Sequence, residues 1–321
     1  MGPGDDKPRA RGAFVGEVLA NERLCQDQVR LLLALEGFPP SRPGQFVQLQ
    51  CRGLHEQLCA REVNWPAGKL PHFTQAELTD HEPLLRRPFS LAGRRRDADG
   101  RDVLTIIHRT VGTGTRWLAG VRAGQRLSVL GPLGNAFAID ADKPLAALVG
   151  GGVGIPPMLY LAEALTGAGK RAVAFSGARS ASLLPVTLGD GAEVAADGRE
   201  TLCVREFAAC GIPSVIATDD GSLGRSGTIS EAFRDWLNVR ARDGGRLVVY
   251  ACGPEPMARA VAETCLSRGV ACQLALERNM ACGMGTCQSC AVKVCDDSDA
   301  GWSYKLCCTD GPVFDARRLL W

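Results

Sequence analysis

The 321-residue chain has little excess charge, few aromatic residues and no long hydrophobic segment. Its formal net charge is +2, which offers no electrostatic basis for binding nucleic acid or an anionic membrane surface. Aromatic residues make up 6% of the chain, and the five tryptophans are scattered rather than arrayed for stacking on bases. The low net charge and the few aromatic residues argue against a nucleic-acid-binding protein. The overall composition is that of an ordinary globular protein.

No segment predicts a membrane span or an export signal. The N-terminus, MGPGDDKPRARGAF, has acids and prolines but no apolar run, so we expect no signal peptide. One uncharged stretch of nearly spanning length, residues 144–162, has four glycines and a Pro-Pro pair. It lacks the flanking aromatic anchors of a membrane helix and predicts a strand, a glycine turn and a helix. We therefore expect a cytoplasmic protein.

Cysteine, in contrast, is abundant, with fourteen residues. Without an export signal, these thiols are expected to stay reduced or to bind metal. Several lie in apolar surroundings and are predicted to be small buried hydrophobes: Cys25, Cys203, Cys210, Cys265 and Cys272. Three others are concentrated in MACGMGTCQSCAVKV, residues 280–294, where a cluster, a zinc site and a disulfide knot have to be distinguished.

Three parts of the chain differ in their hydrophobic pattern. Residues 13–143 show short alternating runs broken by Gly and Pro, which predict an antiparallel barrel, with a polar insertion at about 51–83. Residues 144–274 alternate strands and helices, which predicts a Rossmann-like parallel α/β sheet with its ligand at the carboxyl ends of the strands. Residues 275–321 are too few for an independent core, so a metal or cluster is expected to stabilise them. We predict an α/β plus β protein of three domains.

Three turns carry residues suited to phosphate groups. The glycine turn Gly150–Gly154 joins a strand to a helix, so its backbone can approach a pyrophosphate, although it meets GxGxxG only loosely and a plain tight turn is the alternative. In HRTVGTGTRWLAG, Gly114 and Thr115 precede a short helix. In LLRRPFSLAG, Arg87 is either a phosphate ligand or a surface arginine before an edge strand.

The spacing Cys282-x4-Cys287-x2-Cys290, followed by a later cysteine, is that of a plant-type [2Fe–2S] cluster. The small residues inside the loop let backbone amides approach the sulfurs. Zinc sites usually use two CxxC-like pairs or Cys/His pairs, and only one C-x2-C is present. The pattern therefore favours an iron–sulfur cluster over zinc and over cysteines without metal.

The fourth cluster ligand is left open between Cys307 and Cys308. Adjacent residues of an extended chain point to opposite sides, so only one of the two should reach the cluster. Cys295 is a poorer candidate, because five residues after Cys290 are too few to reach the second iron.

The order of these motifs resembles that of the ferredoxin–NAD(P) reductase superfamily over nearly the whole chain. The matching elements are Arg87-Pro88-Phe89-Ser90, then Gly112-Thr113-Gly114-Thr115, the glycine-rich turn, and Cys252-Gly253-Pro254. The cysteine loop, the segment CTDGPVFDA and the segment TDDGSLGRSG resemble more closely the electron-transfer subunits of NAD-linked, two-subunit dihydroorotate dehydrogenases. The insertion at 51–83 and the stretch 185–199 are longer than the family pattern.

The resemblance implies FAD and a [2Fe–2S] cluster as cofactors and NAD as a substrate. By resemblance, Arg87 binds an FAD phosphate, Ser90 lies near flavin N5, and Cys308 is the fourth cluster ligand. The full set of implied cofactor-binding residues is Arg87, Pro88, Phe89, Ser90, Ile107, His108, Arg109, Gly114, Thr115, Gly151, Gly152, Gly154, Cys252, Gly253 and Pro254. The implied cluster ligands are Cys282, Cys287, Cys290 and Cys308.

The resemblance also implies a partner, an FMN-containing subunit that oxidises dihydroorotate to orotate, in a heterotetramer of two copies of each chain. Electrons would pass between NAD(H), FAD, the cluster and the partner flavin, because a flavin can exchange electrons both singly and in pairs. No residue of this chain is assigned as a catalytic acid or base. The segment 177–184, GARSASLL, has no acid to bind a ribose hydroxyl, and Arg179 could accept a phosphate, so NAD is preferred over NADP on the resemblance alone.

Two other functions remain as alternatives. The chain could be another reductase of the superfamily, serving an oxygenase, ferredoxin or a glutamate-synthase-like partner, or a non-catalytic iron–sulfur redox sensor. Within the insertion, Cys51, His55 and Cys59 form a C-x3-H-x3-C pattern that is either a zinc site or a polar loop.

Overall fold

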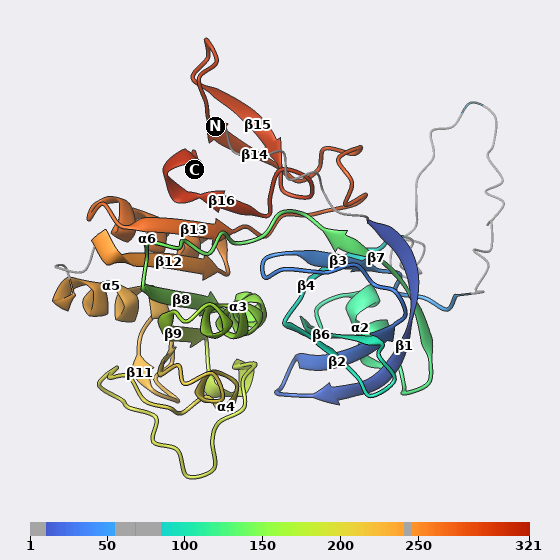
Figure 1. The fold of residues 1–321 in the computed structure, drawn as a ribbon, viewed down its shortest axis with the longest axis horizontal. Helices are drawn as coiled ribbons and strands as arrows, with labels where there is room; N and C mark the ends of the chain where they lie inside the picture. The colour runs from blue at the N-terminus through green and yellow to red at the C-terminus, as the bar shows by residue number, and fades with distance from the viewer. Residues whose placement is uncertain (1–10, 55–67, 69–84, 241–244) are drawn as a thin grey trace.

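The computed structural model describes residues 11–54, 68, 85–240 and 245–321. Two seven-stranded sheets lie side by side, and a two-stranded hairpin lies above them (Figure 1). Most of the insertion predicted at 51–83 falls outside the described residues, as do His55 and Cys59 of the C-x3-H-x3-C pattern.

The first sheet is antiparallel and curls into a barrel, in the order β4-β3-β7-β1-β2-β6-β5. Alternate residues of its strands point inward, as a period of two requires, so Leu31, Leu33 and Leu35 of β2 are buried in one core. The helix α2 (Thr113–Ala119) buries Leu118 in the same core. The strands are β1 (Gly12–Arg23), β2 (Gln28–Leu35), β3 (Phe46–Leu49), β4 (Arg87–Ser90), β5 (Gly93–Arg96), β6 (Asp102–Arg109) and β7 (Arg126–Leu133).

The second sheet is parallel over its first six strands, in the order β11-β10-β9-β8-β12-β13-β16. The strand residues are buried on both faces, which explains why β8 reads as the continuous apolar run LAALVGG. The strands are β8 (Leu145–Gly151), β9 (Arg171–Ala178), β10 (Ser214–Thr218), β11 (Arg225–Ser226), β12 (Leu247–Cys252), β13 (Ala271–Ala275) and β16 (Val313–Asp315).

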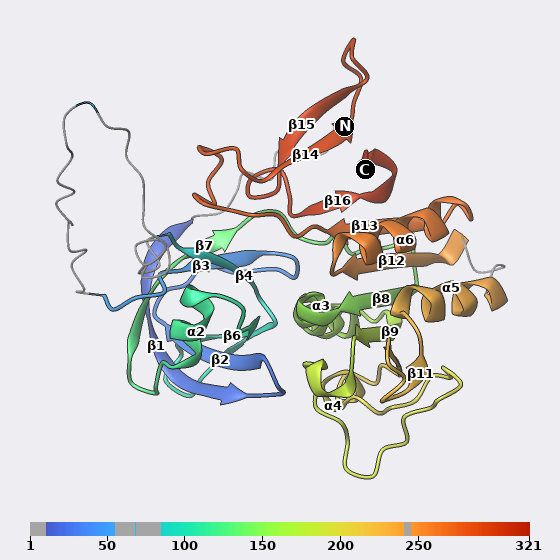
Figure 2. The same cartoon turned by 180° about the vertical axis from the view of Figure 1, so that it is seen from behind.

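Helices cover both faces of the second sheet. Residues of α3 (Ile155–Gly167) and α4 (Arg205–Ala208) share one core with Ala146 and Leu148 of β8. Residues of α5 (Ile229–Val239) and α6 (Glu255–Leu266) share another core with Ala147 and Val149, which point the opposite way. Figures 1 and 2 show α3 on the side of the second sheet nearest the barrel, and Tyr160 of α3 donates to the Ser41 carbonyl at 2.7 Å. The described part of the chain also contains the short 3₁₀ turns η1 (Gly152–Gly154), η2 (Ala181–Leu183) and η4 (Ala316–Arg318).

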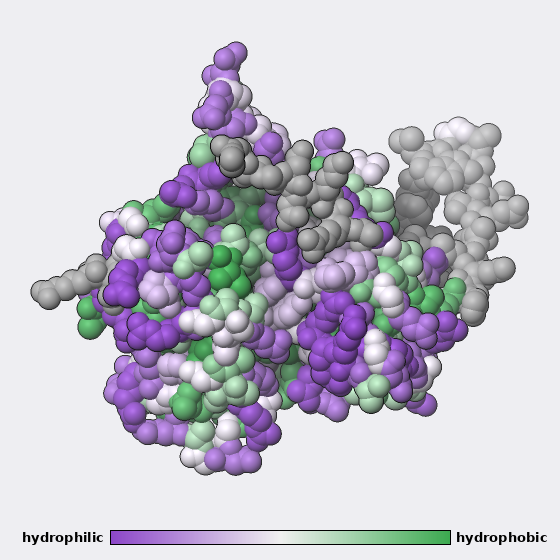
Figure 3. Space-filling view, viewed as in Figure 1, coloured by the Kyte–Doolittle hydropathy of each residue, from purple (hydrophilic) through white to green (hydrophobic). Residues whose placement is uncertain are grey.

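The C-terminal segment joins the second sheet instead of standing alone. Its hairpin is formed by β14 (Ala291–Cys295) and β15 (Trp302–Leu306), and the acidic tip between them is hydrophilic in Figure 3. The chain then returns so that β16 pairs antiparallel with β13. A segment too short for its own core therefore uses the edge of a neighbouring sheet.

The predicted fold class is confirmed, with an antiparallel barrel-like sheet, a Rossmann-like parallel sheet and a small cysteine-rich segment at the C-terminal end. Residues 144–162 form β8, the glycine turn and the start of α3, as predicted. Among the residues that the structure describes, no helix combines the length and apolarity needed to cross a membrane.

Candidate cofactor and cluster site

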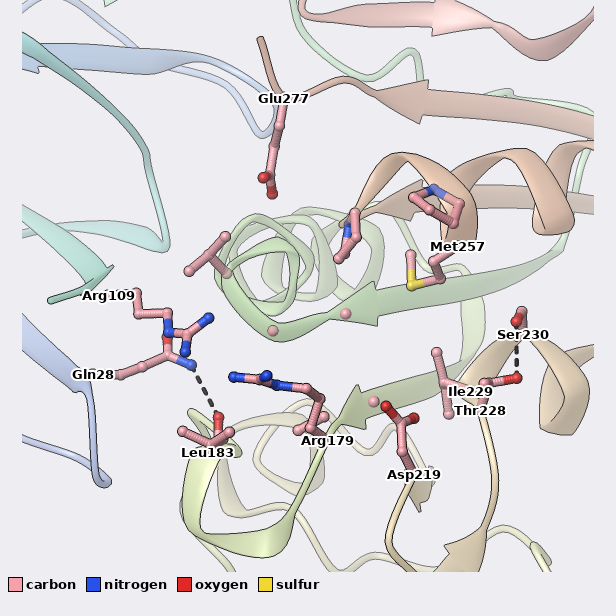
Figure 4. Close-up of a pocket in the computed structure, with 17 residues that line it drawn as sticks. Gln28, Arg109, Arg179, Leu183, Asp219, Thr228, Ile229, Ser230, Met257 and Glu277 are labelled. Atoms are coloured by element: carbon pink, nitrogen blue, oxygen red, sulfur yellow. Dashed lines mark hydrogen bonds between the residues drawn. The ribbon is translucent and has the colours of Figure 1, made fainter. Parts of the chain in front are cut away.

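Two adjoining cavities lie between the two sheets. The larger, of about 650 Å³, is bounded by β4, β6 and the segment that follows β13. The smaller, of about 490 Å³, lies at the carboxyl ends of β8, β9 and β10, where a parallel sheet is expected to bind its ligand (Figure 4). Arg109, Val153 and Glu277 line both cavities, so the two sites meet at these residues.

The larger cavity collects the residues predicted to contact a flavin. Its lining includes Pro88, Phe89 and Ser90 of β4 and Ile107, His108 and Arg109 of β6. The two strands are far apart in sequence and come together because the barrel curls. Their roles in binding remain predictions, but the structure places all six side chains or backbones around one space.

His108 is buried at the base of the larger cavity. Its ring packs edge-on against Phe89, with centroids 5.6 Å apart. Burial lowers the pKa of His108 to about 4, an effect that the Arg109 backbone partly opposes, so the ring is neutral near pH 7. The cavity is therefore walled here by an uncharged flat ring, which suits a planar aromatic ligand.

Arg87 and Gly114, from two separate sequence motifs, lie against each other. A Cβ atom placed on Gly114 would lie 3.5 Å from the Cγ and Nε atoms of Arg87. The Arg87 guanidinium donates to the backbone carbonyls of Leu85 and Arg86, and no carboxylate of the described residues pairs with it. An arginine without an acidic partner beside a helix N-terminus is a combination suited to a phosphate.

Thr115 has a local role that the sequence did not indicate. Its hydroxyl accepts hydrogen bonds from the backbone N–H groups of Val111 at 2.9 Å and Gly112 at 3.0 Å. The hydroxyl thus caps the first turn of α2. A contact between Thr115 and a pyrophosphate remains a prediction.

The glycines of the turn after β8 have different structural roles. Gly151 and Gly152 line the smaller cavity, and Gly152 has a φ of +53°. Gly154 instead packs against β12, because a Cβ atom there would lie 2.1 Å from the Cys252 carbonyl oxygen. Glycine is required at Gly154 for the close approach of a helix and a strand.

The Cys252-Gly253-Pro254 motif lies beneath this turn. Pro254 lines the smaller cavity, whereas Cys252 is buried at the end of β12 and is not among the lining residues of either cavity. Burial raises the pKa of the Cys252 thiol well above its ordinary value. Its predicted contact with a nicotinamide remains untested by the geometry.

Several lining residues were not predicted from the sequence, among them Gln28, Asp219, Thr228 and Glu277. Asp219 directly follows β10, and Figure 4 shows it on the same side of the cavity as Arg179. Glu277 follows β13 and faces the cavities, and desolvation by the surrounding protein raises the pKa of its carboxyl. The rule that ligands bind beyond the carboxyl ends of parallel strands would have identified both acids.

The cysteine loop brings its thiols together in two pairs. The Cys287 N–H points at the Cys282 sulfur, at 3.4 Å, as does the Met284 N–H at 3.5 Å. The Cys308 thiol lies beside the Cys290 thiol, and burial together with this neighbour raises the pKa of Cys308 to about 12. Hydrogen bonds from Ser289, and then from Cys282, lower the pKa of Cys287 to about 6. One iron per pair of thiolates is the arrangement that a [2Fe–2S] cluster needs.

Positive φ angles shape this loop. Gly283 has φ +70°, Gly285 has φ +91° and Gln288 has φ +57°. Such angles turn backbone amides toward the sulfurs, and only glycine adopts them without strain. Across the described residues, no three Cys, His, Asp or Glu side chains converge on one point as a single metal ion would require. The two pairs of thiols fit a cluster of two irons, each bound by two thiolates.

Comparison with known proteins agrees with this geometry. Residues 277–320 match the model of the iron–sulfur cluster binding domain of dihydroorotate dehydrogenase B. The chain is 33% identical over 310 residues to the dihydroorotate dehydrogenase B (NAD(+)), electron transfer subunit, of Caldanaerobacter subterraneus subsp. tengcongensis, covering 97% of this chain and 99% of that one. It is 38% identical over 263 residues to the subunit of the same name from Bacillus caldolyticus, covering 81% and 88%.

The fold also matches a solved structure of an NADH-dependent reduced ferredoxin-NADP oxidoreductase. The TM-score is 0.67 at 24% identity, with 95% of this chain and 90% of the other covered. At this identity the match supports the fold alone. Together with the sequence matches over nearly the full length, it shows that the chain belongs to the family of dihydroorotate dehydrogenase B (NAD(+)) electron transfer subunits.

Proposed function

We propose that this chain carries electrons between NAD(H) and an FMN-containing dihydroorotate dehydrogenase subunit, with FAD and a [2Fe–2S] cluster bound, in pyrimidine biosynthesis. The observation that carries the proposal is the pair of cavities joined at Arg109, Val153 and Glu277, with a four-thiol loop in the same chain. When bound, FAD would connect the two-electron chemistry of a nicotinamide with the one-electron chemistry of a cluster.

We assign residues 13–143 to FAD binding. Pro88, Phe89 and Ser90 would hold the flavin ring against the neutral face of His108 in the larger cavity. Arg87, which lies against Gly114, would pair with a phosphate of the cofactor. The fit rests on an apolar cavity wall and on a guanidinium that has no acidic partner among the described residues.

We assign residues 144–274 to binding of NAD. Gly151 and Gly152 would let the nucleotide approach the backbone, and Asp219 would accept a hydrogen bond from a ribose hydroxyl. Glu277 and Arg109, at the junction of the cavities, would border the nicotinamide and exclude water from it. Asp219 thus supports NAD as the nucleotide, which the sequence left to the resemblance.

We assign residues 275–321 to the cluster, with Cys282, Cys287, Cys290 and Cys308 as its ligands. Cys287 and Met284 are exposed, so this loop is a surface that a partner protein can approach. We assign no side chain of this chain to the deprotonation of dihydroorotate, which would be the chemistry of the proposed partner. A heterotetramer of two copies of each chain remains the expected assembly.

The test is a spectroscopic and coupled assay of the purified full chain. NADH should bleach both flavin and [2Fe–2S] absorption, and adding an FMN-type dihydroorotate dehydrogenase subunit should give dihydroorotate-dependent reduction of NAD+. A colourless, zinc-containing protein would refute the whole proposal. A protein that is bleached by NADH but passes electrons only to ferredoxin or an oxygenase would instead support the alternative reductase function.

A further inference from the structure

Gln48 is a buried glutamine on the outer face of the barrel, with 1% of its surface exposed. It belongs to β3, where Val47 and Leu49 point into the barrel core. Phe46 and Gln48 point the other way, because side chains alternate along a strand. Phe46 packs in the same apolar core as Cys290 and Cys308, so this face of β3 is directed at the cysteine loop.

Both ends of the Gln48 amide are bonded to the loop backbone. The nitrogen donates to the Cys282 carbonyl at 3.1 Å, and the oxygen accepts from the Gly283 N–H at 3.3 Å. These partners decide which way round the amide lies, since the opposite orientation would set donor against donor and acceptor against acceptor. A single side chain of the barrel thus holds the peptide that joins the first predicted cluster ligand to its neighbour.

The contact is so close that only glycine fits opposite Gln48. A Cβ atom on Gly283 would lie 2.5 Å from the Cδ atom of Gln48, and Gly283 also has φ +70°. The loop is therefore shaped to receive this amide at short range. An amide that is buried and satisfied at both ends resists displacement, because leaving either end unpaired costs free energy.

The strand that carries Gln48 is paired with the strand that carries the predicted flavin motif. Gln48 lies directly opposite Pro88 in the β3–β4 register. Pro88 and Phe46 both line the larger cavity. This pair of strands therefore borders the larger cavity and also contacts the cysteine loop through Gln48. Figure 1 shows the loop above β3 and β4.

We propose that Gln48 is a positioning residue that sets the placement of the [2Fe–2S] cluster relative to the flavin. This inference rests on the proposed function, because it presupposes both cofactors. With both cofactors bound, the step concerned would transfer one electron between the flavin and the cluster and would break no bond. The rate of such a step falls steeply with the distance between the cofactors, and hydrogen bonds around the ligands tune the potential of a metal centre. A side chain that holds the Cys282 peptide therefore affects both the rate and the potential.

The experiment compares Gln48→Met with wild type in the full chain carrying both cofactors. Methionine has nearly the volume of glutamine but makes neither hydrogen bond. The matched control is Gln273→Met, because Gln273 also holds one residue through both amide ends, donating to Ala138 O at 2.8 Å and accepting from Ala138 N at 2.9 Å. That pair of bonds lies away from the cysteine loop.

The readouts are iron and sulfide content, the EPR spectrum and midpoint potential of the cluster, and stopped-flow rates after mixing with NADH. In Gln48→Met we expect full iron content, unchanged flavin reduction by NADH, an altered EPR spectrum and cluster reduction slowed about tenfold, the lower end for outer-shell changes. Gln273→Met should match wild type in all of them. A Gln48→Met protein with wild-type EPR spectrum, potential and cluster reduction rate would overturn the inference.

A second variant keeps the test decisive if Gln48→Met does not fold. Gln48→Glu retains the acceptor for the Gly283 N–H and loses the donor to the Cys282 carbonyl. It adds negative charge beside an anionic cluster, so the midpoint potential should become more negative, and an unchanged potential and rate would refute the proposed role. Absence of iron and sulfide from the wild-type protein would refute the proposed function instead, so the two failures are distinguishable.

Discussion

At the scale of single residues, Cys307 and Cys308 show how neighbours in sequence acquire different surroundings. The Cys308 thiol lies beside Cys290, is influenced by Cys282 and accepts from the Gly285 N–H. Of the loop cysteines, Cys290 is the one among the main groups that shift the pKa of Cys307. Burial raises the pKa of Cys307 to about 12 as well, and both thiols lie in the same apolar core, so the neighbours Cys282 and Gly285 are what favour Cys308.

We therefore predict that Cys308→Ser loses the cluster and that Cys307→Ser keeps it. The serine hydroxyl is a poor substitute for a thiolate on iron, whereas in the core it replaces a sulfur that binds no metal. Iron and sulfide analysis with EPR of the reduced protein measures the difference. The opposite pattern would assign the fourth ligand to Cys307.

Asp219 lines the smaller cavity, where we propose that it distinguishes NAD from NADP. We predict that Asp219→Asn lowers the preference for NADH over NADPH, measured as the ratio of kcat/KM values, by about tenfold. That factor corresponds to losing one charge-assisted hydrogen bond of about 1.4 kcal/mol to a ribose hydroxyl. The change also removes repulsion of a 2′-phosphate.

The neighbouring Asp220→Asn is the control for this prediction. The Asp220 carboxylate accepts from the Ser222 N–H at 3.0 Å and from its hydroxyl at 2.6 Å, and Asp220 does not line the cavity. The nucleotide preference of this variant should stay at the wild-type value. An equal shift in both variants would show that Asp219 does not act on the ribose directly.

At the scale of elements, α3 depends on glycine at its start but not at its end. Gly154 lets the helix pack on β12, where a Cβ atom would lie 2.1 Å from a backbone oxygen. Gly167, the last residue of α3, has no atom within 4 Å of its hypothetical Cβ. Glycine is therefore required for packing at the start of α3, whereas nothing around Gly167 requires glycine at its end.

We predict that Gly154→Ala destabilises the protein by at least about 3 kcal/mol, because backbone atoms cannot move aside as a flexible side chain can. Gly167→Ala should stabilise it by up to about 1 kcal/mol, since alanine loses less conformational freedom in a helix. Thermal unfolding of the two variants measures both effects. A Gly154→Ala protein as stable as wild type would contradict the close packing.

At the scale of the whole molecule, the C-terminal segment is held by both sheets. It contributes β16 to the second sheet. Asn135, just after β7 of the first sheet, donates to the carbonyls of Asp310 and Val313 and accepts from the Val313 N–H, each at 2.9 Å. The predicted cluster domain is thus fixed between the other two, where it can face both the flavin cavity and the surface.

We predict that Asn135→Ala loosens this docking by roughly 2–3 kcal/mol, about 1 kcal/mol for each hydrogen bond lost. Hydrogen exchange of residues 305–315, followed by mass spectrometry, should then accelerate by roughly 30-fold or more. Asn21→Ala provides the control, because Asn21 also makes three hydrogen bonds, to the carbonyls of Leu118, Ala119 and Val121 within the barrel. Its effect should be confined to α2, and equal acceleration in both variants would argue against a specific clamp.

Much of the fold was predictable because it depends on short-range pattern. Alternating runs identified the barrel strands, the run LAALVGG identified a strand buried on both faces, and the glycine turn marked the start of α3. The pairing of β16 with β13 was not predictable, because three residues carry no signal for the sheet that they will join. The insertion at 51–83 falls largely outside the described residues, so the prediction for it stays open.

The sequence by itself determined which chemical groups are present and in what order: the cluster spacing, the arginine and glycine motifs, and the two sheet types. Each depends on residues within a few positions of one another. Tertiary structure alone decided that Arg87 meets Gly114, that Asp219 enters the nucleotide cavity, that Cys308 faces the loop, and that Gln48 holds it. The physical reason is that these contacts join distant segments, and they form only when packing of both sheets brings those segments within hydrogen-bond range.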